Sequence, residues 1–88
     1  GTIALSALVL SDDGIGNVRI TGTATNANAF TVNDTIIAGT LIDDAGQVVS
    51  VGSTRLLGDI APGESRSFDL RIVYEPYASH QLYAAATH

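Results

Sequence analysis

The 88-residue sequence predicts a small all-β domain, an antiparallel β-sandwich of about six to seven strands. Apolar and polar residues alternate over residues 18–26 and 66–72, which is the period of a half-buried strand. Clusters of Gly, Pro, Asn and Asp separate such runs at short intervals, as in sandwiches. The sequence shows no sustained apolar period of 3.6 residues, so helices are not expected.

Composition narrows the class of protein. Hydrophobic residues make up 45% of the chain, enough for the core of one domain over residues 1–88. The absence of cysteine excludes disulfides, thiol catalysis and thiolate metal sites, and it argues against a eukaryotic secreted module. No apolar run approaches the roughly 18 residues of a membrane span. No signal peptide is visible, because the start lacks a basic region. Since no Met precedes Gly1, we interpret Gly1 as a cut from a longer chain or a tag remnant.

The net charge is −5, and all four cationic residues are arginine. A negative field repels phosphate and anionic headgroups, so neither a nucleic-acid partner nor insertion into a membrane is expected. Two interpretations of the acidity stay open. One is solubility, and the other is adaptation of a halophile to high salt.

The first two strands are predicted from their alternation. In the first, Ile3 to Leu10, one face comprises Ile3, Leu5, Ala7 and Val9, and the other Leu8 and Leu10. The second, Val18 to Asn26, buries Val18, Ile20, Gly22 and Ala24. An inward glycine in a strand marks a bulge or a close approach, and Gly22 is expected to be one. A polar loop is expected over residues 26–34, with Phe30 and Val32 attaching it to the core.

The strongest local signal is a hairpin with Asp43 to Gly46 at its tip, between two β-branched runs. The Asp43 carboxylate is expected to accept a backbone hydrogen bond two residues on, and Gly46 to adopt positive φ. Before the turn, Ile37, Gly39 and Leu41 point inward, while Ile36, Ala38 and Ile42 leave the opposite face partly apolar. After it, Val49 and Val51 pack across the pair, Gly52 to Thr54 loosen the strand, and Leu56 and Leu57 return to the core.

A turn with Pro62 and Gly63 at its tip leads into another half-buried strand. This strand turns Phe68, Leu70 and Ile72 inward. Pro76 ends the run. Residues 79–85 combine strand alternation with helix-favouring alanines, and the all-β context favours a final edge strand.

Three stretches resemble FxLYD-type domains. Residues 18–26 resemble the family's "v.i.G.v.N" strand, which includes Gly22 and Asn26. Residues 38–49 are similar to its "a.LyD..G.vv" hairpin, with Leu41, Asp43 and Gly46 at the motif positions and Ile42 where the family has Tyr. Residues 57–68 resemble its "l.PGe...F" segment, which holds Pro62, Gly63 and Phe68. The stretches follow the family's order.

This resemblance implies an immunoglobulin- or fibronectin-III-like sandwich from an exported bacterial or archaeal protein. Such domains are accessory modules of secreted or cell-surface chains, so we expect an extracellular or cell-envelope location. The expected role is that of a monomeric spacer or protein-interaction domain. The expected partners are other domains of the same chain or another surface protein.

The sequence offers no constellation for catalysis or for a cofactor. His80 and His88 lie in no motif with a serine, so no enzyme activity is expected. The adjacent acids Asp12 and Asp13 lack the ligand spacing of an EF-hand, so turn formation and solvation are expected there rather than calcium binding. No metal site is therefore predicted.

Two further features keep alternatives open. Asn33-Asp34-Thr35 is a glycosylation sequon on the predicted loop, where modification and a chance match are both compatible with the sequence. Tyr74, Tyr77 and Tyr83 lie in the last fifteen residues, either packed at the core edge or exposed as a ligand surface. The alternative function is thus a carbohydrate- or small-ligand-binding module, which would need coplanar, exposed rings.

Overall fold

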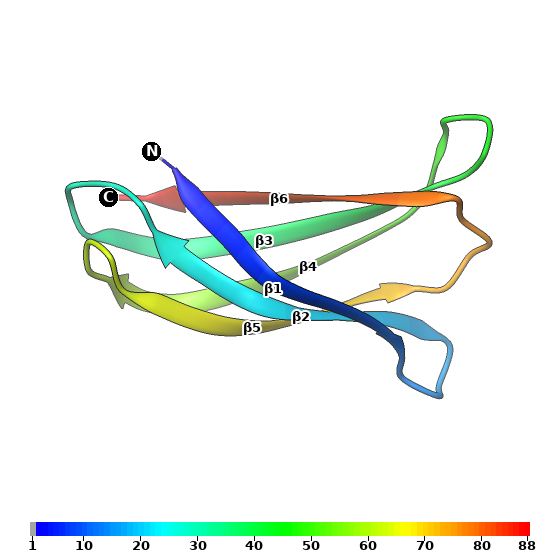
Figure 1. The fold of residues 1–88 in the computed structure, drawn as a ribbon, viewed down its shortest axis with the longest axis horizontal. Helices are drawn as coiled ribbons and strands as arrows, with labels where there is room; N and C mark the ends of the chain where they lie inside the picture. The colour runs from blue at the N-terminus through cyan, green and yellow to red at the C-terminus, as the bar shows by residue number, and fades with distance from the viewer. Residues whose placement is uncertain (1) are drawn as a thin grey trace.

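A computed structural model describes residues 2–88, which form six antiparallel strands and no helix (Figure 1). The all-β prediction is confirmed. None of these residues belongs to a helix that could cross a membrane. The strands are β1 (Ile3–Asp12), β2 (Asn17–Asn26), β3 (Val32–Ile42), β4 (Val48–Ile60), β5 (Ser65–Val73) and β6 (Ser79–Thr87).

The strands form two three-stranded sheets within residues 2–88, ordered β1-β2-β5 and β4-β3-β6. The first sheet packs over the second, and the core lies between them (Figure 1). Inward residues alternate along each central strand, as the sequence predicted. The buried cluster consists of Val18, Ile20, Ala24, Ile37, Leu41, Phe68, Leu70 and Ile72.

Gly22 is the predicted point of close approach inside the first sheet. A Cβ atom at this position would lie 2.8 Å from Leu8 Cδ2 and 2.8 Å from Phe68 Cζ. The two side chains therefore fill the space that any other residue would need. Leu8 and Phe68 meet over the glycine backbone.

Asn26 is a fully buried polar residue that joins the end of β2 to both neighbouring connections. Its Nδ2 donates to the carbonyl oxygens of Phe30 and Ile60, each at 2.8 Å. Its backbone oxygen accepts from the Gly63 amide at 2.8 Å. Because these partners replace water, burial of the amide is not penalised.

Both predicted turns are confirmed. The Asp43 Oδ1 atom accepts from the amides of Ala45 at 3.0 Å and Gln47 at 2.9 Å, and Gly46 has φ +79°. In the Pro62–Gly63 turn, the Glu64 amide donates to the Ala61 carbonyl at 2.9 Å. This second turn carries the chain from β4 in one sheet to β5 in the other.

The predicted alternation of the first strand is wrong beyond Ser6. A bulge sets Ala7 and Leu8 of β1 opposite Gly22 alone, and Ala7 has φ +54°. One extra residue reverses the alternation. Val9 is therefore 58% exposed, whereas Leu10 packs against the core together with Ile3 and Leu5.

The boundaries of β3 and β4 also differ from the prediction. The loop expected over residues 26–34 ends earlier, because Val32 already lies buried at the start of β3. β4 runs without interruption through Gly52, so this segment does not loosen. Val51 lies across the pair from Thr40, as expected, and is exposed to solvent. A bulge at Gly58, with φ +87°, turns Leu57 outward, and Ile60 is buried instead.

Residues 79–87 form an edge strand, β6, as predicted. β6 pairs with β3 along almost its whole length, with Gly39 opposite Leu82 and Ile37 opposite Ala84. Leu82 and Ala84 therefore share the inward face and pack against the core. Ala84 thus serves as a small inward strand residue, and its neighbour Ala85 as a small outward one.

Candidate functional site

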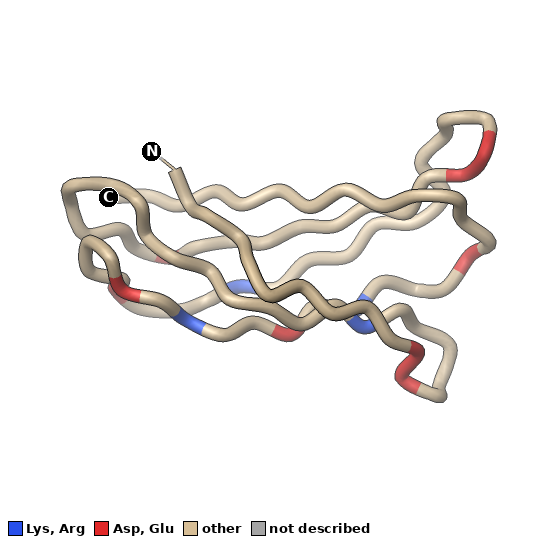
Figure 2. Tube along the Cα trace, viewed as in Figure 1, with Lys and Arg blue, Asp and Glu red and all other residues tan. Residues whose placement is uncertain are grey.

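Three connections gather at one end of the sandwich, on the right in Figure 1: the β1–β2 turn, the β3–β4 hairpin and the β5–β6 connection. The Tyr74 amide donates to the Gly16 carbonyl at 2.9 Å, and the Ala78 amide to the Ile42 carbonyl at 2.8 Å. Five of the nine acidic residues lie at this end (Figure 2): Asp12, Asp13, Asp43, Asp44 and Glu75.

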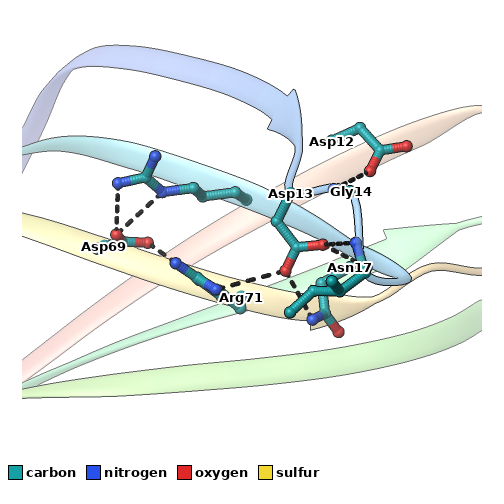
Figure 3. A network of polar contacts seen from close by, with 8 residues as sticks. Asp12, Asp13, Gly14, Asn17, Asp69 and Arg71 are labelled. Carbon is teal, nitrogen blue, oxygen red and sulfur yellow. Dashed lines mark hydrogen bonds and ion pairs between the residues drawn. The ribbon is translucent and has the colours of Figure 1, made fainter.

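Asp13 is the hub of a polar network at this end (Figure 3). Its Oδ1 accepts from the amides of Ile15 and Asn17, and its Oδ2 from Asn17 Nδ2 at 2.7 Å. The side-chain hydrogen bond from Asn17, followed by these amides and the Arg71 charge, holds the pKa of Asp13 below its usual value. The side chain of Asp13 is only 3% exposed.

The network continues over the outer side of the first sheet. Arg71 Nη1 lies 3.5 Å from Asp13 Oδ2, and its Nε lies 3.8 Å from Asp69 Oδ1. Arg19 Nη2 donates to Asp69 Oδ2 at 2.7 Å. This hydrogen bond lowers the pKa of Asp69 and raises that of Arg19. The ion pairs link β2, β5 and the first turn.

Metal binding finds no support in this geometry. The described part of the chain holds no group of three or more His, Asp or Glu side chains arranged around a common point. Asp12 Oδ1 accepts from the Gly14 amide at 2.7 Å, and the Asp13 oxygens are engaged as above. Both carboxylates thus accept backbone amide hydrogen bonds within the turn, as expected for turn formation.

Tyr74 and Tyr77 lie at the acidic end and contact each other at a steep angle. Their ring centroids are 6.3 Å apart, with an interplanar angle of 74°. Tyr77 borders two hollows, one of about 220 Å³ beside Leu10 and Asn17 and one of about 490 Å³ beside Asp43, Asp44, Val49, Pro76 and Ala78. The two rings are thus an edge-to-face pair and not a coplanar platform.

Tyr83 lies apart from this pair. It is in the middle of β6, opposite Ala38 of β3, and its hydroxyl donates to Gln81 Oε1. The structure therefore brings Tyr74 and Tyr77 together. It places Tyr83 on the side of the second sheet that faces away from the core. Nothing in the sequence between residues 74 and 79 indicated how the connection would fold.

The glycosylation sequon does not lie on a loop. Asn33 and Thr35 belong to β3, where a bulge at Asp34 has φ +48°. Asn33 is half-buried and its carbonyl accepts from Thr87 Oγ1 at 3.1 Å. Thr35 is fully buried, and its hydroxyl has no hydrogen-bond partner within residues 2–88. The second sheet thus encloses the hydroxyl that the sequon requires.

Exposed apolar residues gather on the outer face of the second sheet, which we define by four cross-strand rows. Sequence reasoning identified Ile36, Ala38 and Ile42 on this face, and its expectation that Val51 packs across the pair agrees with the register, in which Val51 lies opposite Thr40. From one end to the other, the rows are Arg55–Ile36–Ala85, Ser53–Ala38–Tyr83, Val51–Thr40–Gln81 and Val48–Ile42–Ser79.

This outer face is unlike the rest of the surface. Val51 is 62% exposed, Tyr83 52% and Ile36 39%. Among the described residues of the four rows, only Arg55 carries a charge. The remaining positions are apolar or carry a neutral polar side chain, Gln81 being the longest of these, whereas charged residues are common on an open sheet face. The acidic hairpin at Asp43 and Asp44 borders the face at its other end.

Comparisons of this chain with protein-family models, with curated proteins and with solved structures find no match.

Proposed function

We propose that this chain is a non-catalytic module of an exported prokaryotic protein and makes protein contacts through the outer face of the second sheet. The single observation that carries this proposal is the apolar character of that face, on which Arg55 is the one charged residue, in a chain of net charge −5. Contiguous exposed apolar patches on soluble domains mark interaction sites. The module thus acts as a spacer that also binds a protein neighbour, at the cell surface or outside the cell.

The strand order supports an immunoglobulin-like assignment. In immunoglobulin sandwiches, the first, second and fifth strands share one sheet, and the third and sixth share the other. The order here is β1-β2-β5 and β4-β3-β6, which follows this arrangement with β4 beside β3. The resemblance of residues 18–68 to FxLYD-type domains agrees with it. Fold analogy alone does not assign a function, so the proposal rests on the exposed face.

A photo-cross-linking experiment tests the contact. A photoreactive phenylalanine analogue replaces Tyr83 on the outer face, or Ser67 on the outward side of β5 as a matched control. Irradiation of cells that make the protein should link position 83, but not position 67, to another polypeptide. Equal yields at both positions, or no adduct at position 83, would contradict the proposal.

The hollows beside Tyr77, rather than a coplanar pair of rings, support a second candidate, a small-ligand site. The supporting observation is that the Tyr77 ring borders both hollows at the acidic end. A panel of neutral and amino sugars, titrated against the protein by NMR, should shift signals of Tyr77 and spare Tyr83. Identical shifts in wild type and Tyr77→Ala, or none at all, would exclude a sugar site at this pair.

A further inference from the structure

We infer that the outer face of the second sheet binds the same face of a second copy of this chain, in a weak symmetric dimer with antiparallel strands. This inference rests on the proposed function and names its partner. It departs from the monomer expected from the sequence. Four features of the face lead to it: its neutrality, the placement of its single charge, its small residues and its size.

Neutrality selects the partner. An acidic face would suit a cationic partner and a basic face an anionic one, but the rows from Ile36 to Ile42 offer neither. An apolar face gains free energy by covering another apolar face. Most oligomers of soluble proteins are homo-oligomers with twofold symmetry, in which one patch meets itself. A second copy supplies a face of the same apolar character.

The single charge on the face fixes the orientation. Arg55 lies in the row of Ile36, and the acidic hairpin begins directly after Ile42, six residues further along β3. Six residues of strand span about 20 Å. A twofold axis perpendicular to the strands, passing near Gly39, carries Arg55 to the end at which the partner's Asp44 lies. Each dimer then contains two ion pairs, each between Arg55 of one copy and Asp44 of the other. Parallel packing would instead bring the two arginines to the same end.

The small residues on the face permit sheet-on-sheet packing. Ala38, Thr40 and Ser53 form its middle, and Tyr83 and Val51 rise on either side. Sheets pack face to face about 10 Å apart when their side chains interdigitate. About the axis near Gly39, Val51 of one copy can therefore lie over Ser53 of the other. The antiparallel arrangement sets Tyr83 and Val51 against opposite halves of the partner's face.

The size of the face predicts weak association. Three strands about 4.8 Å apart and about 20 Å long give a footprint of roughly 300 Å². Stable interfaces bury about 800 Å² of accessible surface on each partner. Side-chain relief enlarges the accessible area, but the face remains at the lower end of specific interfaces. We therefore expect pairing at concentrations of roughly 10 µM to 1 mM rather than a permanent dimer.

Sedimentation equilibrium of the purified 88-residue chain tests the inference. The apparent mass should rise from the monomer value of 9.1 kDa toward twice that value as the concentration increases through this range. Val51→Asp should abolish the rise, whereas Ser67→Asp, which adds the same charge on the other sheet, should retain it. Equal melting temperatures confirm that both variants fold. A wild-type chain that stays monomeric, or a dimer that Val51→Asp leaves intact, would overturn the inference.

A charge exchange tests the orientation separately. Arg55→Asp and Asp44→Arg should each weaken pairing by about two- to tenfold, because each removes both symmetric ion pairs. The double variant should restore wild-type affinity. Asp43 is left unchanged since its carboxylate closes the hairpin. A double variant no tighter than the single ones would overturn the antiparallel arrangement.

The inference and the proposed function fail in different ways. If the purified chain stays monomeric while position 83 still cross-links to a different polypeptide in cells, the dimer is wrong and the contact face stands. If position 83 cross-links to nothing in cells, the contact function itself is wrong. A cross-linked species of twice the mass of the protein supports both.

Discussion

Gly52 of β4 lies directly against the carbonyl oxygen of Arg71 in β5. A Cβ atom on Gly52 would overlap that oxygen, and it would lie 2.9 Å from Ile72 Cγ1. β4 and β5 belong to different sheets, so this contact is where the two sheets come together along one side. Because the obstacle is backbone, no change of rotamer can make room for a side chain.

Gly52→Ala should therefore destabilise the protein. We expect a loss of about 1–3 kcal/mol in the free energy of unfolding, typical of overpacking, because β4 must move away from β5. Urea denaturation measures the loss. The control is Ser53→Ala, at the adjacent outward position, which should change stability by less than about 0.5 kcal/mol. Similar effects of both variants would show that β4 and β5 do not meet at Gly52.

The hairpin glycine makes a different demand. Gly46 has φ +79°, and no atom lies within 4 Å of the position that its Cβ would occupy. Gly46→Val should cost about 1 kcal/mol or more from backbone strain alone, since a β-branched residue resists positive φ. Gly46→Asn, which tolerates this region better, should cost less. If both substitutions leave the urea midpoint unchanged, Gly46 does not occupy the left-handed region.

Thr35 offers a stabilising substitution. Its hydroxyl is buried without a partner within residues 2–88, and an unsatisfied buried polar group costs about 1–3 kcal/mol. Thr35→Val replaces the hydroxyl by a methyl group of similar size and should raise stability by about 1 kcal/mol. Thr21→Val, at an outward position of β2, controls for strand propensity. A gain no larger than that of the control would mean that the Thr35 hydroxyl is satisfied.

The ion-pair network predicts loss of stability in acid. The pKa values of Asp13 and Asp69 are lowered in the folded state, foremost by hydrogen bonds from Asn17 and Arg19. As the pH falls below the ordinary value of 3.8, the unfolded chain therefore binds protons first. The contribution of Asp13 and Asp69 to the free energy of unfolding is fully present above pH 3.8, and it disappears as the pH falls through their lowered pKa values.

Thermal melts from neutral pH to about pH 2 measure this dependence. Asp13→Asn and Asp69→Asn should each lower the melting temperature at neutral pH and flatten the acid limb. Asp44→Asn, at an exposed position of the hairpin, should retain the steep acid limb. An acid limb in Asp13→Asn as steep as that of wild type would assign the loss to other groups.

Salt should stabilise the fold. The net charge of −5, with five acids at one end, opposes the compact state through self-repulsion. The Debye length falls from about 30 Å at 0.01 M to about 3 Å at 1 M salt, which screens that repulsion. We expect sodium chloride to raise the melting temperature by about 5 °C over this range.

The salt titration is done at about 5 µM protein, below the range in which pairing is expected. A variant with Asp44→Asn and Glu75→Gln, both exposed at the acidic end, should show a flatter salt dependence. If the wild-type melting temperature does not rise, the acidity serves solubility alone, and salt adaptation is excluded.

Strand alternation predicted β2 and β5 well because neither contains a bulge where the two pair. It predicted β1 wrongly after Ser6, since a bulge leaves no mark in a run of apolar residues. Asn33 and Asp34 indicated a loop because they favour turns, yet they occupy a bulge inside β3. Local preference and tertiary pairing oppose each other at these positions, and pairing prevails.

Gly52 is a second position at which a local sequence pattern cannot predict the structure. A glycine in a strand run indicates either weakness or close approach, and only the position of β5 distinguishes the two. The sequence predicted part of the outer face, namely Ile36, Ala38 and Ile42 of β3. Its remainder depended on the register of β4 and β6 against β3, and the β6 residues lie 37 to 49 positions away from their β3 partners, as in Ile42 opposite Ser79 and Ile36 opposite Ala85. Side chains meet there by pairing, which no local pattern encodes.

The sheet order also governs the route by which the chain reaches its fold. β1 and β2, like β3 and β4, can pair as local hairpins, but β5 pairs with β2 and β6 with β3 across distant parts of the chain. Closing such long loops costs entropy before the contacts compensate for it, so folding on the millisecond-to-second scale is expected. Until β6 pairs with β3, β3 exposes an unpaired edge beside the apolar outer face. A partly synthesised chain therefore exposes two aggregation-prone surfaces at once, and rapid pairing of residues 79–87 protects it from aggregation.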